Sequence, residues 1–169
     1  MKEARKMAVG SMMAALSVVL MAVGSIAGLG MYAAPMFAGM CLLPIGKELG
    51  RKYHVILWLV VSVLSFILVP NVEQNLMYFA LFGCYPILRP AFQKLAKLPR
   101  ILLKLLFFNA ITVALEALVM LVLVPESMGA ALLIVLLLLG NFTFIVYDFL
   151  IPRMEIILAH YLKKIGFYR

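Results

Sequence analysis

Charged residues are scarce in this chain of 169 residues, at 13% against roughly 25% in an average soluble domain. Hydrophobic residues make up 66%, and the mean hydropathy is +1.13. This composition predicts an all-α integral membrane protein. The net charge of +8 does not indicate a nucleic-acid partner, because the basic residues form short clusters between apolar runs, as at the cytoplasmic ends of membrane spans.

Familiar enzyme motifs are also missing. The chain contains no GxxxxGK[ST], GxSxG, HExxH or CxxC pattern. Cys41 and Cys84 lie inside apolar stretches, which is typical of packed thiols rather than of a disulfide or a metal pair. His54 and His160 have no acid at ligand spacing. We therefore expect no enzymatic activity, no cofactor and no metal.

The sequence predicts a single transmembrane domain over residues 1–169. It consists of six apolar stretches and, from Pro152, a cytoplasmic interfacial tail, 152–169. A helix needs about 20 residues to cross ~30 Å of hydrocarbon, and the middle three stretches are near or below that limit. Pro35 and Pro44 interrupt the second stretch, so a broken or re-entrant element remains an alternative there. The predicted spans are about 7–29, 31–46, 54–69, 75–90, 101–124 and 128–151.

The distribution of lysine and arginine predicts the topology. If the N-terminus is inside, all 15 basic residues fall in cytoplasmic segments. The outer connections, around Leu29–Met31, Pro70–Asn75 and Pro125–Met128, contain none of them. By the positive-inside rule we expect six crossings with both termini cytoplasmic. Such short loops leave no room for a soluble catalytic domain.

Small residues form a stripe along the first span, at spacings of three and four. In lipid such a stripe allows close approach of helix backbones. It can pack against the protein's own helices or dock another membrane subunit, and both interpretations remain open. The stripe consists of Gly10, Ala14, Ser17, Met21, Gly24 and Gly28. Ser11 and Ala15 form a second pair of small residues beside it.

The fifth span carries an acid near its middle. Asn109, Thr112 and Glu116 share one helical face, and lipid offers a carboxylate no partner. Glu116 is therefore either a neutral acid bonded to a neighbouring helix or a group of a binding site. Asn141 on the sixth span lies at a similar depth, so the two side chains could converge on one object.

Further polar residues lie on the fourth and sixth spans. An aromatic stripe on the fourth span would serve packing, or form the wall of a site for a flat ligand. The stripe consists of Gln74, Tyr78, Phe82, Tyr85 and Arg89.

Arg89 and Asp148 both lie near the inner boundary, where we expect them to form a structural ion pair.

In length, span number, minimal loops and the small-residue stripe, the chain resembles the substrate-binding S component of energy-coupling factor (ECF) transporters. The resemblance covers the whole chain in layout. Members of that family carry an Ala-x-x-x-Ala pattern on the first helix, where they meet a transmembrane coupling subunit. The matching positions read Gly10-x-x-x-Ala14 and Ser11-x-x-x-Ala15, which keep the small size but not the letters.

The resemblance implies a multi-pass subunit of a bacterial cell membrane that captures a vitamin-like micronutrient from outside. Its partners would be a coupling subunit and two ATPase subunits, which drive release. On this analogy the substrate would meet Gln74, Asn75, Tyr78 and Glu116, with Asn141 at the floor. The outer half of the sixth span has no polar side chain, so a substrate should be small or largely apolar, with one cationic or hydrogen-donating group facing Glu116.

Two other functions fit the same layout. A non-transporting scaffold of the cell envelope would need no ligand, and its buried polar residues should then satisfy one another. A stand-alone small permease would cycle a proton on Glu116, although no internal repeat is evident. The cytoplasmic stretch RPAFQKLAKLPRILLK is expected to bind anionic membrane lipid or to steady a partner subunit.

Overall fold

The computed structural model describes residues 2–26, 32–122 and 130–164, and within these ranges all regular structure is helical. The predicted outer connections around 29–31 and 125–128 lie outside the described residues, as does the end of the tail. The elements are α1 (Lys2–Ile26), α2 (Ala33–Cys41), α3 (Leu43–Glu48), α4 (Arg51–Leu68), α5 (Val72–Met77), the π-helix η1 (Tyr78–Phe82), α6 (Tyr85–Gln93), α7 (Lys97–Val122) and α8 (Ala130–Lys164).

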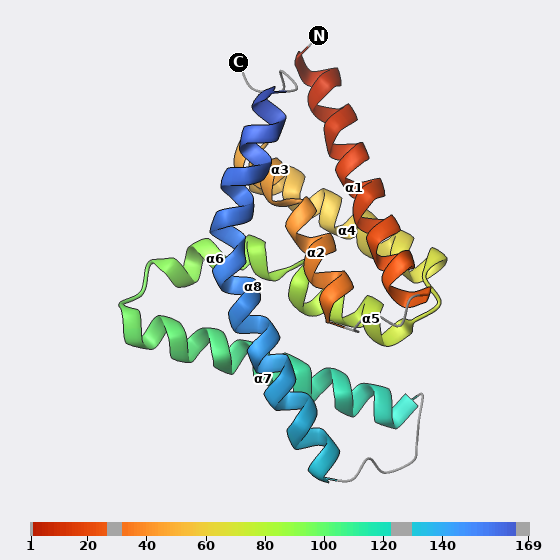
Figure 1. The fold of residues 1–169 in the computed structure, drawn as a ribbon, viewed down its shortest axis with the longest axis vertical. Helices are drawn as coiled ribbons and strands as arrows, with labels where there is room; N and C mark the ends of the chain where they lie inside the picture. Colours follow the sequence, from red (N-terminus) through yellow and green to blue (C-terminus); the bar gives the residue numbers. More distant parts are fainter. Residues whose placement is uncertain (1, 27–31, 123–129, 165–169) are drawn as a thin grey trace.

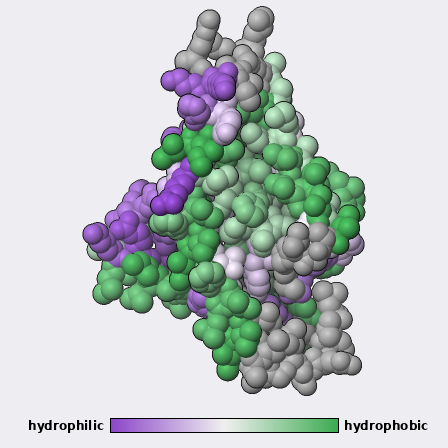
Figure 2. All heavy atoms as spheres, in the orientation of Figure 1, coloured by the Kyte–Doolittle hydropathy of each residue, from purple (hydrophilic) through white to green (hydrophobic). Residues whose placement is uncertain are grey.

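The all-helical class is confirmed for the described residues, and three helices there are long and apolar enough to cross a membrane. Many large apolar side chains on α4 and α7 are exposed, including Ile67 and Leu106. Such faces would be unfavourable in water but suit contact with lipid. In Figure 2 much of the visible face is hydrophobic, and hydrophilic residues gather near the end of α8 and around the α6–α7 turn. The candidate spans are Met7–Ile26, Arg51–Leu68 and Lys97–Val119.

The long helices differ in direction. In Figure 1, α1 descends from the top toward the right, α4 and α7 run from left to right, and α8 rises from the bottom to the top. The start of α1 and the end of α8 therefore lie at one end of the molecule. This placement is compatible with termini on one side of a membrane, and the six crossings and their orientation stay predictions.

The second predicted span is broken, which is the alternative that its prolines raised. The break falls at Leu42, whose backbone N–H donates to the carbonyl of Gly39 as α2 ends. Pro44 then lies in the first turn of α3. Pro35 likewise lies in the first turn of its helix, α2, where a missing N–H leaves no helical hydrogen bond unmade, but it follows the start of the predicted span rather than a break inside it. Only one of the two prolines thus marks the break.

The fourth predicted span is also divided, into α5, η1 and α6. Within η1 the helix widens, and the Gly83 N–H donates to the Tyr78 carbonyl over five residues, at 2.8 Å. A turn at Gly83 and Cys84 then leads into α6, with Pro86 in its first turn. Tyr78 and Phe82 before this turn and Tyr85 after it are fully buried, whereas Phe79 is exposed.

The predicted boundary at Pro152 does not end the sixth helix, because α8 continues through it to Lys164, over 35 residues. Pro152 lacks the N–H that would bond to the carbonyl four residues earlier, but the helix is held on both sides of it. Ile151 and Leu162 are both buried within the fold. Tertiary packing therefore overrides the local helix-breaking tendency.

Two clusters of buried side chains form the core, one centred on α1, α2 and α4, the other on α2, η1 and the last helices. α2 belongs to both, and its contacts require glycine at the closest points. A Cβ on Gly24 would overlap Ala34, and one on Gly39 would lie 2.8 Å from the Tyr147 hydroxyl. The Tyr147 hydroxyl donates to the Phe82 carbonyl at 2.6 Å, which joins α8 to the π segment.

Candidate functional site

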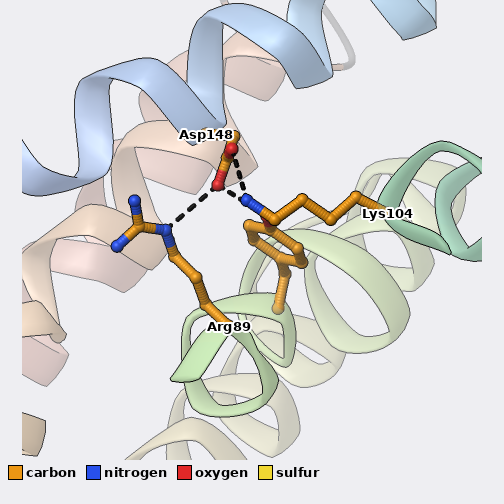
Figure 3. A network of polar contacts seen from close by, with 4 residues as sticks. Arg89, Lys104 and Asp148 are labelled. Carbon is orange, nitrogen blue, oxygen red and sulfur yellow. Dashed lines mark hydrogen bonds and ion pairs between the residues drawn. The ribbon is translucent and has the colours of Figure 1, made fainter. Parts of the chain in front are cut away.

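The predicted Arg89–Asp148 ion pair is confirmed, and it belongs to a larger network that joins α6, α7 and α8. Arg89 Nε donates to Asp148 Oδ1 at 3.0 Å, and Lys104 Nζ donates to Oδ2 at 2.6 Å. The Tyr85 hydroxyl donates to Oδ1 at 2.6 Å. Figure 3 shows Arg89 and Lys104 reaching Asp148 from different directions. Lys104 is only 8% exposed, and both cations are bound to Asp148. The network therefore stabilises the fold rather than forming a binding site.

Asn141 and Asn109 satisfy each other. Each side-chain amide donates to the other's oxygen, at 2.9 and 2.8 Å, and each also donates to a carbonyl one turn earlier in its own helix. Asn109 and Glu116 are seven residues apart, which is about 10.5 Å along α7. The structure therefore joins Asn141 to Asn109 and not to Glu116, and its amide is already occupied.

Gln74 and Asn75 use their amide groups inside the fold. Gln74 Nε2 donates to the Met21 carbonyl at 2.7 Å, which links α5 to α1. Asn75 Nδ2 donates to the Val69 carbonyl at 2.9 Å. The Asn75 Oδ1 atom, however, is buried with no hydrogen-bond partner among the described residues. Both residues thus contribute at least partly to structure.

Tyr78 is completely buried at the start of η1. Its hydroxyl has no hydrogen-bond partner among the described residues. A buried hydroxyl without a partner costs roughly 1–3 kcal/mol. Since Tyr78 packs in the α1, α2 and α4 cluster, its ring serves the core, while its hydroxyl remains available to a bound molecule or water.

Glu116 has the strongest unmet polar requirement in this part of the molecule. It is 3% exposed, and neither carboxylate oxygen has a hydrogen-bond partner among the described residues. Thr112, one turn earlier on the same face of α7, is fully buried and its hydroxyl is likewise unpartnered. The predicted polar face of α7 is therefore divided. Asn109 is satisfied, whereas Thr112 and Glu116 are not.

Two residues that sequence reasoning did not assign to the site lie near Glu116. Burial, and secondly the charge of Glu116, raise the pKa of Glu73 in the first turn of α5. The Tyr32 hydroxyl is within electrostatic reach of both carboxylates and is buried without a partner among the described residues. Gly140 of α8 lies close to the Tyr32 ring, since a Cβ there would be 3.8 Å from its Cζ, at ordinary contact distance. Tyr32, directly before α2, and Glu73 of α5 are thus close enough to Glu116 of α7 for their charges to interact.

The part of the first-helix stripe from Gly10 to Gly24 packs mainly inside this chain, and Gly28 lies outside the described residues. Gly10 and Ala14 are buried, and a Cβ on Gly10 would lie 3.3 Å from Leu57 Cδ1 in α4. The Ser17 hydroxyl donates to the Ala38 carbonyl of α2 at 2.9 Å. Ser11 and Ala15 are exposed. Any docking of a partner on this helix, which stays a prediction, would use the second pair rather than the first.

A pocket of about 380 Å³ opens elsewhere, between α3, α4, α6 and α8. It is lined by none of the residues predicted to meet substrate, and its polar residues include Lys47, Arg51 and His54. No cluster of metal-ligand residues occurs within the described parts of the chain, where both cysteines are free thiols.

Comparisons of the chain with protein-family models, with curated proteins and with solved structures gave no match.

Proposed function

We propose that this protein is a solute-capture subunit of the S-component type, binding a small, largely apolar, vitamin-like molecule for an ECF importer. The observation that carries the proposal is the Glu116 carboxylate, buried in a predicted span with neither oxygen bonded to a described residue. An ionisable group in that position usually belongs to a functional site. Thr112 adds an unpartnered hydroxyl one turn away.

The surroundings of Glu116 favour a ligand with a positive charge or with hydrogen-bond donors. Glu73 brings a second carboxylate close enough for the two charges to interact, and Tyr32 adds a hydroxyl. Two neighbouring carboxylates repel each other when both are ionised, and a cationic group between them would relieve that repulsion. The aromatic ring of Tyr32 and the apolar surroundings suit the remainder of a small hydrophobic molecule.

A non-transporting scaffold is the second candidate, and specific observations favour it too. The Asp148 network and the Asn109–Asn141 pair are internally satisfied, and much of the first-helix stripe is used within the chain. In a pure scaffold, however, Glu116 and Thr112 should be satisfied in the same way. That neither side chain has a partner in the described part of the chain is what separates the two functions.

Purification from the native membrane tests the assembly. The protein would be extracted in a mild detergent through a neutral affinity tag, and the accompanying proteins identified by mass spectrometry. We expect a transmembrane coupling subunit and two ATPase subunits. Recovery of cell-wall or cell-shape proteins without ATPases would reject the importer and support the scaffold.

A second experiment tests the site itself. Small molecules released by denaturing the purified protein would be compared between the unmodified chain, Glu116→Gln, Thr112→Val and the exposed control Glu48→Gln. We expect a compound that is retained by the control and lost or strongly reduced in both site variants. If all four proteins elute as the same monodisperse species and carry the same compounds, Glu116 and Thr112 do not bind a ligand.

A further inference from the structure

The pocket between α3, α4, α6 and α8 is separate from Glu116 and Thr112, and the proposed function does not need it. Its volume of about 380 Å³ exceeds what a single water or ion fills. Three of its lining residues are cations, namely Lys47, Arg51 and Lys94, and one, Glu155, is an acid. The pocket is therefore net positive and suits an anion.

His54 gives this pocket a polar inner wall. The side chain is 5% exposed, and its Nε2 atom is buried without a hydrogen-bond partner among the described residues. The imidazole lies against Gly46, where a Cβ would overlap Nδ1 and lie 3.1 Å from Cγ. Glycine at position 46 thus makes the space that the ring occupies. An anionic oxygen is the kind of partner that a ring N–H lacks here.

The rest of the pocket wall is apolar. Leu43 comes from α3, and Pro86, Ile87 and Pro90 come from α6. A site for free inorganic phosphate would gain little from these side chains. A molecule that joins an anionic head to an apolar body would use both parts of the wall. Phospholipids have this chemistry, and they are present at high concentration around any membrane protein.

The position of the pocket in the sequence supports the same ligand. Its cations, Lys47, Arg51 and Lys94, lie in segments that the charge distribution assigns to the cytoplasmic side. Basic pockets between helices at that face are typical sites for anionic lipid headgroups. We propose that this pocket binds the phosphate group of an anionic phospholipid, held by Arg51 and Lys94 at its rim and His54 at its inner wall.

The test uses the full chain in a neutral detergent, with dioleoyl phosphatidylglycerol and dioleoyl phosphatidylcholine as probes and native mass spectrometry as readout. The pocket variant is Arg51→Gln with Lys94→Gln. The matched control is Lys52→Gln with Lys163→Gln, which removes the same charge from exposed residues that do not line the pocket. His54→Phe keeps a flat ring of similar size and removes the ring N–H.

We expect the unmodified chain to bind phosphatidylglycerol more tightly than phosphatidylcholine. The pocket variant should weaken phosphatidylglycerol binding about tenfold, while the control should change it less than about twofold. His54→Phe should also weaken it. Equal affinity for the two lipids, or an equal loss in the pocket and control variants, would overturn the proposal.

Competition identifies which part of the lipid is recognised. Inorganic phosphate and glycerol 3-phosphate would be added at millimolar concentration to the complex with phosphatidylglycerol. If neither displaces it, the acyl chains contribute and a membrane lipid is the ligand. If either displaces it and the effect disappears in Arg51→Gln with Lys94→Gln, the phosphate group is recognised alone and a soluble phosphate compound is the source.

Discussion

At the scale of single residues, Asp148 has the largest expected effect on stability. Its carboxylate accepts hydrogen bonds from Arg89, Lys104 and Tyr85. Asp148→Asn would leave two poorly exposed cations without a counter-charge, which costs about 3 kcal/mol or more. We expect a clearly lower midpoint of thermal unfolding in detergent. The control Glu48→Gln, which removes an exposed acid, should change the midpoint little, and an equal effect of the two variants would contradict the structure.

Glu73 should make stability depend on pH. Its pKa in the fold is raised by burial and by Glu116, whereas in the unfolded chain it is near the ordinary value of about 4.3. The folded state therefore binds the proton more tightly, and this group's contribution to stability falls as pH rises from about 4.3 through the raised pKa. Glu73→Gln should remove this loss.

Thermal unfolding measured from pH 4 to 7 checks this expectation. The stability of Glu73→Gln relative to the unmodified chain should increase with rising pH. A difference that is constant with pH, or that decreases toward neutrality, would mean that Glu73 is not held near a second acid. Glu48→Gln serves as the exposed reference.

Several polar residues could be placed from the sequence, but most of their partners could not. Counting residues from the ends of the spans placed Arg89 and Asp148 at one depth, and they do pair. Lys104 was assigned to a basic cytoplasmic segment, although its long side chain reaches back to Asp148. Asn141 was matched by depth to Glu116, but it bonds Asn109. Depth follows from one helix at a time, whereas pairing depends on the relative rotation and register of two helices.

At the scale of helices, Gly39 determines how closely α2 approaches the π segment. A Cβ there would overlap the Phe82 carbonyl oxygen and lie 2.8 Å from the Tyr147 hydroxyl. Although alanine favours an exposed helix by about 1 kcal/mol over glycine, Gly39→Ala should be destabilising by about 1–3 kcal/mol, because backbone must move. Thermal unfolding in detergent would measure the change.

Gly10→Ala provides the comparison for this prediction. A Cβ at position 10 would meet only the flexible end of Leu57, at 3.3 Å, so the α1–α4 contact can adjust. We expect a small change of either sign. If Gly10→Ala destabilised the protein as much as Gly39→Ala, the close contact between α2 and η1 would not be the cause of the loss at position 39.

The long helices α1, α7 and α8 were predictable because their apolar runs reach the length needed to span a bilayer, whereas the run that forms α4 is near the lower limit. The internal breaks were less so. Prolines correctly raised the possibility of a break in the second span, where Pro44 lies in the first turn of α3. Pro86 lies in the same way in the first turn of α6, after the division of the fourth span at Gly83, but no break was predicted from it. The continuation of α8 through Pro152 depends on packing on both sides, which a local sequence pattern does not contain.

At the scale of the whole molecule, the placement of the helix ends makes topology testable. With Cys41 and Cys84 replaced by alanine, a single cysteine would be introduced at Pro70 or at Lys97, both of which are exposed. The predicted orientation requires Pro70→Cys to react with a membrane-impermeant maleimide in intact cells. Lys97→Cys should react only after the membrane is permeabilised. Equal labelling of both in intact cells would contradict the orientation.

The Asp148 network has a consequence for the order in which the protein is made. In the order of translation α6 and α7 come first, bringing Arg89 and Lys104, and their counter-charge arrives only with α8. Until then the nascent chain carries two cations near the membrane boundary with no acid to neutralise them. A chain interrupted before α8 would therefore retain two cations without the carboxylate that both of them bind in the folded protein.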